Sequence, residues 1–347
     1  MAEPIDALVP GVDYPARLAQ LRSWFPTDDD CRDYLEWVRW PYGFICPHCG
    51  ASGSKGSDDL YRCRGCRRRV SVTAGTIFQD TRTPLSVWFE IIWLMVVPKN
   101  GVSAQDLYRI MPVGSYQTVW TMLTKLRTAM TSMDKAKLSG VVEVDEWYHG
   151  GVAKGGSCLT GKNLVVAAVE HAANGRGLGR VRFRVILQRT AWELRKAIYT
   201  TVEPGSRIIT DGLNAYPSAL AGYTHEPRNE SAPDAAPAHV LLPGVHRVFS
   251  LADRWLLGTH QGGVKPGHLH EYLDEFAFRF NRRHSRHRGL LFYRLIEHAI
   301  TAPPVTYKDL VRQSTPKPVP PHPPTAPTWP GTLETTPSNR PWRQAKK

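Results

Sequence analysis

The stretch VVEVDEWYHGG (residues 141–151) starts as an apolar strand and then carries acidic side chains within it. Alternation along a strand would place Glu143 and Asp145 on one face and Glu146 on the other. Burying a carboxylate is costly unless it binds a cation or forms an ion pair. The stretch therefore predicts a strand that delivers acidic groups to a functional site.

The chain around this stretch has the pattern of an α/β domain. A second apolar run, RIITDGLNAY (residues 207–216), ends in Asp211 followed by glycine, although Asp–Gly is also a common turn. Runs at 163–171 and 180–187 predict further strands, and residues 191–202 predict a helix between strands. Two strand-borne aspartates in one α/β domain indicate a shared site.

Two CxxC pairs lie nearer the N-terminus. Cys46 and Cys49 are followed, after thirteen residues, by Cys63 and Cys66. Four thiolates at this spacing fit tetrahedral Zn²⁺, and a site filled by four protein ligands is structural. We therefore expect a zinc ribbon at residues 41–80. Residues 1–40 would form a helical lead, and Cys31 and Cys158 would be buried thiols.

Arginines crowd the second CxxC pair. We expect Arg62, Arg67 and Arg68 to contact DNA phosphates, and a solvated charged loop is the alternative.

Residues 84–133 have the layout of a helix-turn-helix segment. Ser115 is a suitable N-cap for the third helix, and Gln117, Thr118 and Thr121 lie near the start of that recognition helix. A small helical bundle that only joins two domains is the alternative. The apolar periodicity predicts helices at about 84–98, 103–111 and 115–131.

The overall composition limits the class of protein. The chain has 347 residues and a net charge of +13, which indicates an anionic partner, usually nucleic acid; a basic enzyme is the alternative. No apolar run approaches the ~20 residues that span a bilayer, and the N-terminus lacks signal-peptide features. We expect a cytoplasmic protein without a membrane contact. Its proline-rich tail, residues 303–347, is expected to be disordered.

Three motifs carry a specific resemblance: VEVDEWYHGG (142–151), ITDGLNAYP (209–217) and the stretch from His246 to Arg283. Together they closely resemble the bacterial insertion-sequence transposases of family fifteen-ninety-five. The resemblance covers roughly residues 20–300 and leaves out the tail. It implies a multidomain protein in which a zinc ribbon and a helix-turn-helix segment precede an α/β RNase H-like DDE catalytic domain at residues 138–300.

The resemblance also implies a catalytic set of Asp145, Asp211 and a third residue early on a helix, which falls on His246. The 34 residues between Asp211 and His246 match a spacing that DDE transposases often show. Two Mg²⁺ or Mn²⁺ ions held there would serve in-line phosphoryl displacement, with Asp145 as the bridging ligand. His246 stands in place of Glu: imidazole suits Mn²⁺ better than Mg²⁺, or it can shuttle protons. A helix-start histidine with an ordinary hydrogen bond is the alternative.

Asp253 is a second departure, because similar transposases usually carry Lys seven residues after the third position. A carboxylate there would repel DNA phosphate. Either Arg254 takes over the DNA contact, which we favour, or Asp253 binds a metal, or the protein is catalytically impaired. The reserve sources of a third carboxylate are Glu271, Asp274 and Glu275.

Two further segments complete the site prediction. FRFNRRHSRHRG (278–289) is arginine-rich, and we expect Arg282 and Arg283 to clamp the DNA backbone; a solvated basic helix end is the alternative. GSCLTGKN (156–163) approximates a phosphate-binding loop but lacks its Ser or Thr, so we interpret it as a hairpin loop.

These observations predict a DNA transposase that binds terminal inverted repeats and catalyses metal-dependent strand cleavage and transfer. Double-stranded DNA, as transposon ends and target, would be its partner in a homo-oligomeric synaptic complex at the bacterial nucleoid. A catalytically impaired or domesticated zinc-ribbon DNA-binding protein is the alternative. An RNase H-fold nuclease without a transfer step is a third possibility.

Overall fold

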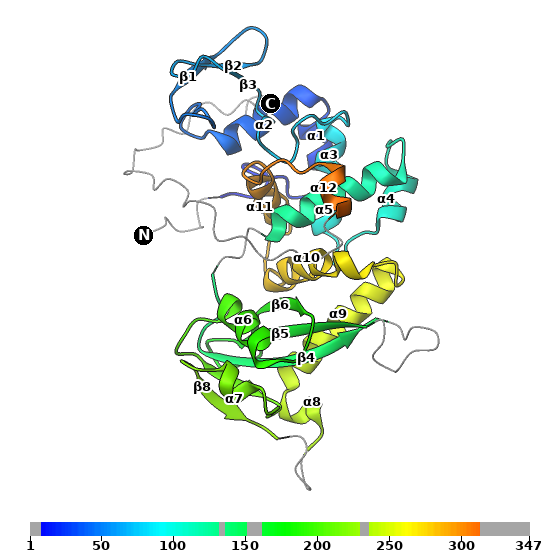
Figure 1. The fold of residues 1–347 in the computed structure, drawn as a ribbon. Coiled ribbons are helices and arrows are strands. Elements are labelled where there is room, and N and C mark those ends of the chain that lie inside the picture. Colours follow the sequence, from blue (N-terminus) through cyan, green and yellow to red (C-terminus); the bar gives the residue numbers. More distant parts are fainter. Residues whose placement is uncertain (1–7, 132–135, 151–161, 230–235, 313–347) are drawn as a thin grey trace.

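The computed structural model describes residues 8–131, 136–150, 162–229 and 236–312. Two lobes are stacked in Figure 1: a helical lobe with a small three-stranded sheet above, and a five-stranded sheet with its own helices below. None of the described helices is long and apolar enough to cross a membrane.

The helical lobe is assembled from three separate parts of the chain. Aromatic side chains from all three meet in its core: the ring of Phe25 lies 4.8 Å from that of Phe89 and 6.3 Å from that of Phe292. The predicted N-terminal helices and the three helices of residues 84–133 are confirmed. The elements of this lobe are α1 (Leu18–Trp24), α2 (Asp28–Arg39), α3 (Leu85–Val96), α4 (Ala104–Ile110), α5 (Tyr116–Thr131), α11 (Gly289–Ala299) and α12 (Tyr307–Arg312).

The two C-terminal helices of this lobe differ from the sequence expectation. α11 lies within residues 138–300 but packs with α2, α3 and α5 in the helical lobe instead of on the large sheet. α12 lies in the segment expected to be disordered, yet it forms against α5 because Leu310 is fully buried there. The rest of that segment, from residue 313, lies outside the described residues.

Helix α5 is the centre of this lobe. Ser115 is its N-cap as predicted, since its Oγ accepts a hydrogen bond from the backbone N–H of Thr118 at 3.1 Å. Val119, Leu123 and Leu126 are completely buried, because α5 packs against α4, α10 and α11. The first turn of α5 is exposed at Tyr116 and Gln117, most of the rest of the helix is buried or half-buried, and the last residue, Thr131, is exposed again.

The small sheet, β1 (Gly53–Lys55), β2 (Tyr61–Cys63) and β3 (Arg69–Val70), is antiparallel and rests on the end of α2. The ring of Tyr61 stacks on Phe44 with centroids 4.5 Å apart, and Trp40 closes the cluster edge-on. Lys55 Nζ donates to Glu36 Oε2 at 2.9 Å. These contacts fix the small sheet to the helical lobe.

The large sheet has the strand order β6-β5-β4-β7-β8. Its first three strands in sequence form an antiparallel meander, and β7 and β8 run parallel to β4. The four predicted strands are confirmed; β8 was not predicted because it is short and polar. The strands are β4 (Val141–His149), β5 (Asn163–His171), β6 (Leu178–Ile186), β7 (Arg207–Thr210) and β8 (Thr224–Pro227).

Helices cover both faces of this sheet, which gives the mixed α/β RNase H-like fold. One face of β4 packs Val142 and Val144 against α6 and α7, and the other packs Trp147 against α9. The 3₁₀ turn Pro266–His268 links α9 to α10. The helices of the sheet lobe are α6 (Ala191–Thr201), α7 (Tyr216–Ala219), α8 (Ala238–Leu241), α9 (Pro243–His260) and α10 (Leu269–Asn281).

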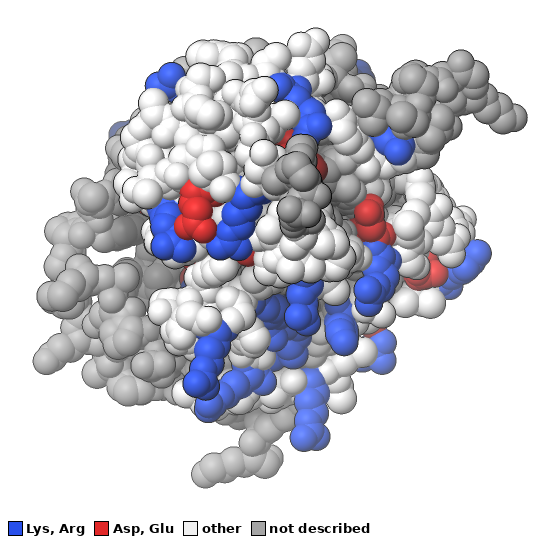
Figure 2. All heavy atoms as spheres, turned by 90° about the horizontal axis from the view of Figure 1, so that it is seen from below, with Lys and Arg blue, Asp and Glu red and all other residues white. Residues whose placement is uncertain are grey.

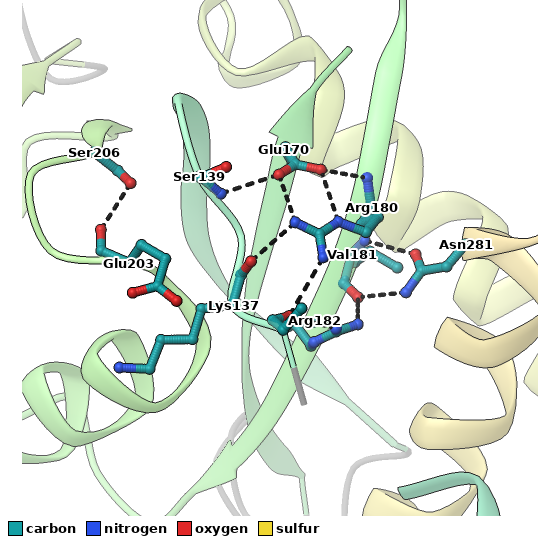
Figure 3. Close-up of polar contacts among 10 residues, drawn as sticks. Lys137, Ser139, Glu170, Arg180, Val181, Arg182, Glu203, Ser206 and Asn281 are labelled. Carbon is teal, nitrogen blue, oxygen red and sulfur yellow. Dashed lines mark hydrogen bonds and ion pairs between the residues drawn. The ribbon is translucent and has the colours of Figure 1, made fainter. Parts of the chain in front are cut away.

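A polar cluster fixes the chain where it enters the sheet lobe (Figure 3). Glu170 accepts hydrogen bonds from the backbone N–H of Ser139 at 3.0 Å and from the Arg180 guanidinium. Arg180 also donates to the carbonyl of Lys137, and the side chain of Asn281 pairs with the backbone of Val181. Burial alone would raise the pKa of Glu170, but these donors outweigh it and the pKa is lowered. The cluster ties the entering chain and the end of α10 to β6.

A buried ion pair joins the two lobes. Arg127 Nε of α5 donates to Glu275 Oε2 of α10 at 2.8 Å, and both side chains are at most 1% exposed. The Arg127 guanidinium also lies 3.8 Å from the centre of the Tyr272 ring. Arg279 of α10 donates to the carbonyl of Met95 at 2.6 Å, near the end of α3. These contacts hold α10 against the helical lobe.

Candidate functional site: a four-cysteine cluster and an acidic cluster

The four cysteines of the small sheet converge on one point. Their sulfur atoms lie within 4.8 Å of one another, with Cys46 Sγ 3.7 Å from Cys66 Sγ and Cys49 Sγ 3.4 Å from Cys63 Sγ. Four sulfurs placed ~2.3 Å from a tetrahedral Zn²⁺ would be about 3.8 Å apart. The predicted ligand set is therefore assembled with a geometry that fits zinc.

The second CxxC turn has the backbone that such a site needs. The N–H of Cys66 points at Cys63 Sγ at 3.4 Å, and this contact lowers the pKa of the Cys63 thiol to about 6. A Cβ on Gly65 would lie 2.8 Å from the Ala51 Cβ and 3.3 Å from Cys49 Sγ. The turn thus leaves no room for a side chain at Gly65 and favours the thiolate form that binds metal.

The arginines of the ribbon are differently placed. All three arginines predicted to contact phosphate are exposed, but Arg62 lies 3.8 Å from the carboxylate of Asp58, which partly offsets its positive charge. Arg68 is also 2.9 Å from His48 Nδ1. Of the three predicted phosphate contacts, Arg67 and Arg68 are therefore the ones that reach the surface without a carboxylate partner among the described residues.

A second cluster forms at the ends of β4 and β7. Oxygen atoms of Asp145, Glu146 and Asp211 lie within 4.8 Å of one another. β4 pairs with β7 so that Glu143 lies opposite Ile209, and the same register places Asp145 level with Asp211 just beyond the end of β7. The parallel pairing thus brings together two carboxylates that are distant in sequence.

Each aspartate of this cluster is oriented by a backbone donor. Asp145 Oδ1 accepts from the N–H of Glu146 at 2.7 Å. Asp211 Oδ1 accepts from the N–H of Leu213 at 3.0 Å, across a turn in which Gly212 has φ +85°. That left-handed conformation favours glycine, so the Asp–Gly pair holds the second carboxylate at the strand end.

Glu146 is the member of the cluster that the sequence interpretation missed. As expected, it leaves β4 on the face opposite Asp145, where Tyr216 OH donates to Oε1 at 2.5 Å and Arg189 Nη2 donates to Oε2 at 2.7 Å. Burial would lower the pKa of Arg189, but its hydrogen bond and ion pair with Glu146 outweigh this and the pKa is raised. The only signal for Glu146 was its position directly after Asp145.

The net negative charge of this cluster favours the binding of a cation. Among the described residues, these three buried or half-buried carboxylates have the Arg189 guanidinium beside them, since its Nη2 is also 4.0 Å from Asp211 Oδ2. Carboxylates this close repel one another, and a bound cation would offset that repulsion. Carboxylate oxygens at this spacing are the ligands that Mg²⁺ and Mn²⁺ prefer. The residues present therefore fit a divalent metal site.

His246 reaches this cluster from α9. Its Nε2 lies 3.5 Å from Asp145 Oδ2, on the face of β4 opposite Tyr216. Two ligands of one ion at about 2.1 Å and a right angle are about 3 Å apart, so this separation suits shared coordination. His246 thus lies next to Asp145, the first aspartate of the predicted set.

The start of α9 is anchored by a carboxylate from the sheet. Buried Glu143 accepts from the N–H of Val245 at 2.8 Å and from His171 Nε2 at 2.8 Å. An anion at a helix N-terminus is stabilised by the unpaired N–H groups there. A Cβ on Gly244 would lie 2.8 Å from Glu143 Oε2, so the contact requires glycine. Glu143 therefore positions the helix turn that carries His246.

Asp253 is not part of the acidic cluster. Its Oδ1 lies 2.8 Å from His149 Nδ1 at the end of β4, two helical turns beyond His246. The neighbouring Arg254 is exposed. Asp253 therefore has a hydrogen-bond partner within the sheet lobe, whereas the side chain of Arg254 can contact another molecule.

The three reserve acids of α10 face the helical lobe. Glu275 pairs with Arg127, Asp274 accepts from Thr131 Oγ1 at 2.8 Å, and Glu271 lies 2.9 Å from His268 Nδ1. Burial raises the pKa of Glu271 to about 7. None of the three belongs to a group of possible metal ligands among the described residues, so the geometry gives no support to these reserve carboxylates.

Several other residues predicted to contact DNA form contacts within the protein. Thr121 Oγ1 donates to the carbonyl of Gln117, and Arg282 lies over the Phe278 ring at 4.4 Å. Arg283 donates to the carbonyls of Gly179 and Leu178. The phosphate-loop-like segment at 156–163 and Cys158 lie almost wholly outside the described residues, whereas Cys31 is buried as predicted.

Comparisons with known proteins agree with both clusters. Residues 26–69 match the transposase zinc-ribbon domain, and residues 137–281 match the ISXO2-like transposase domain. An uncharacterized protein in the transposable element ISH50 of Halobacterium salinarum is 24% identical over 274 residues, which cover 74% of this chain and 91% of that protein. Since the first match contains the four cysteines and the second contains Asp145, Asp211 and His246, this chain belongs to the IS1595 family of transposases, with an N-terminal zinc ribbon and a DDE transposase domain.

Proposed function

We propose that this protein is an active DNA transposase, which binds the terminal inverted repeats of an insertion sequence and catalyses strand cleavage and strand transfer. The observation that carries the proposal is the convergence of Asp145, Glu146 and Asp211 within 4.8 Å, with His246 3.5 Å from Asp145. Its substrate would place the protein at the nucleoid.

Asp145 is the residue best placed to be shared between two ions. It lies between Asp211 on the neighbouring strand and His246 on α9. Two divalent ions held by these side chains would activate the attacking oxygen and stabilise the leaving oxygen of a phosphodiester. His246, as an imidazole, would make Mn²⁺ a better ion than Mg²⁺ on its side. Glu143 and Arg189 would orient the ligands without touching the DNA.

The zinc ribbon and the first turn of α5 would recognise the inverted repeats. Arg67 and Arg68 are exposed on the ribbon, and Gln117 is exposed at the start of α5. Most of the rest of α5 is buried or half-buried, so base contacts would come mainly from that first turn. Cutting two transposon ends in one complex would require a homo-oligomer, as is expected of transposases that pair their ends.

The test is a pair of substitutions, Asp145→Asn and Asp211→Asn, in the full chain. Both should lower strand transfer by more than about 10³-fold, because each removes charge from the metal site. Both should keep wild-type affinity for a duplex of the inverted repeat. Strand transfer at wild-type rates in either variant would refute the proposal.

A second function is favoured by Arg189, whose guanidinium already supplies positive charge to Glu146 and Asp211. A transposase domain neutralised in this way would act only as a zinc-ribbon DNA-binding regulator. A cleavage assay in Mg²⁺ and in Mn²⁺ separates the two. Specific binding of the ends with no cleavage in either ion would favour the regulator.

A further inference from the structure

A groove with a volume of about 1100 Å³ lies between the two lobes. One wall is the α3–α4 loop with the start of α4, and the other is the second half of α9; α10 also lines it. In Figure 1, α4, α9 and α10 meet on the same side of the molecule. Trp255 Nε1 of α9 donates to the carbonyl of Asn100 at 2.9 Å and so holds the walls together at one point.

The lining of the groove is strongly basic. Six of its side chains are Lys or Arg and one, Asp106, is acidic. Arg279, Arg283 and Arg288 donate mainly to main-chain carbonyls, which satisfy their hydrogen bonds without cancelling their charge. Figure 2 shows a similar excess of Lys and Arg over Asp and Glu on the face seen from below.

Two cations of the groove are open to a ligand. Lys99 on the loop and Arg254 on α9 are exposed, and neither forms an ion pair with a described carboxylate. They come from different lobes, so one polyanion in the groove would contact both. Tyr116, Trp255 and Phe276 add aromatic surface. Cations interleaved with aromatic rings are typical of nucleic-acid binding.

Helix α9 connects this groove to the acidic cluster. His246 faces Asp145 on one side of the helix, and Arg254, eight residues later and about 12 Å along the axis, lines the groove. Arg247, seven residues before Arg254 and so on the same side of α9, is exposed. Burial, and to a smaller extent the charge of Arg247, lowers the pKa of Arg283 in the groove. Positive charge thus extends along α9 toward His246.

We propose that this groove binds the phosphate backbone of transposon-end DNA and leads it along α9 to the acidic cluster. The proposal rests on the proposed function and deepens it, because it assigns Lys99 of the helical lobe and Arg254 of the sheet lobe to one continuous DNA path. An acidic segment of a second copy of the chain is the competing occupant.

The experiment compares two double charge reversals in the full, zinc-loaded chain. Lys99→Glu with Arg254→Glu changes the groove. Arg195→Glu with Lys196→Glu changes two exposed cations of α6, outside the groove, by the same net charge. Affinity for an inverted-repeat duplex is measured by fluorescence anisotropy over a salt series, without added Mg²⁺ or chelator.

The groove variant should bind at least about tenfold more weakly, with a salt slope reduced by about 2, as expected for two lost phosphate contacts. The α6 variant should stay within about twofold of wild type. Equal losses in the two variants would overturn the proposal. So would a groove variant that changes only self-association in sedimentation. If the wild-type chain itself fails to bind the duplex, the proposed function fails as well, and Asp145→Asn reports catalysis separately.

Discussion

The zinc ribbon and the acidic cluster are both small groups of metal-binding side chains, but they are built in opposite ways. The four cysteines lie between residues 46 and 66 and are brought together by two short turns. The acidic cluster takes Asp145 from β4, Asp211 from the end of β7 and His246 from α9. The cysteines, which are close in sequence, depend on their metal to hold them together. The acidic side chains, which come from distant elements, are held in position by the whole lobe around them.

This difference predicts which perturbations each site tolerates. The ribbon has a small core of its own, so most of its stability has to come from the metal. The acidic cluster sits on a sheet with a hydrophobic core on each face, so its side chains stay in place without an ion. The following substitutions test that contrast.

The largest effect is expected from Cys63→Ser. Removing one thiolate should abolish zinc binding, which is worth about 10–16 kcal/mol in small zinc domains, and should unfold residues 53–70. Zinc content per chain and hydrogen exchange measure this. Exchange in β4–β6 should not change. Cys31→Ala, at a buried thiol of the helical lobe, should keep its zinc, and a Cys63→Ser chain that retains zinc would contradict the contrast.

The next effect is expected at the contact between the lobes. Arg127→Met removes the nearer cation of buried Glu275 and leaves it only Arg279, at 3.9 Å, so the free energy of unfolding should fall by about 3 kcal/mol. Urea unfolding followed by tryptophan fluorescence measures this. Arg127→Met combined with Glu275→Leu should recover most of the loss. A single variant that loses less than about 1 kcal/mol would show that α10 does not depend on this pair.

A smaller effect is expected at the start of α9. Gly244→Ala would place a Cβ 2.8 Å from Glu143 Oε2, and the overpacking should cost about 1–3 kcal/mol and displace His246. Gly258→Ala is the matched control on the same helix, because no atom lies within 4 Å of its Cβ. It should stabilise the chain by about 0.5–1 kcal/mol. The melting temperatures of the two variants are compared by thermal unfolding, and their strand-transfer rates are a second readout. Equal melting temperatures would argue against a tight α9 anchor.

The smallest effect on stability is expected from Asp253→Asn. The carboxylate is 41% exposed, so its pairing with His149 should contribute at most about 1 kcal/mol. The melting temperature and the cleavage rate should both stay near wild type. A complete loss of cleavage would instead make Asp253 a metal ligand, which is one of the alternatives that the sequence left open.

Much of the architecture could be predicted from local pattern. The CxxC spacing predicted the four-cysteine cluster, and apolar periodicity predicted α3, α4, α5 and the strands β4 to β7. Strand alternation also placed Glu143 and Asp145 opposite Glu146, as the structure confirms. These predictions were correct because turns, strands and amphipathic helices are specified by residues that are close together in the chain.

Other features could not be predicted in this way. The inclusion of Glu146 in the acidic cluster depends on Arg189 and Tyr216, which come from other elements. The partner of Asp253 depends on how α9 crosses β4. The position of α11 in the helical lobe depends on long-range packing around Phe292.

The sequence by itself therefore determined the zinc ligands, the strands that carry the two aspartates and the basic character of the chain. Only the tertiary structure decided that Glu146 joins the aspartates, that Glu143 anchors the helix of His246 and that a basic groove opens between the lobes. The physical reason is distance along the chain. Spacing within a turn or strand specifies which side chains can meet locally, whereas contacts between remote elements are decided by sheet pairing and core packing.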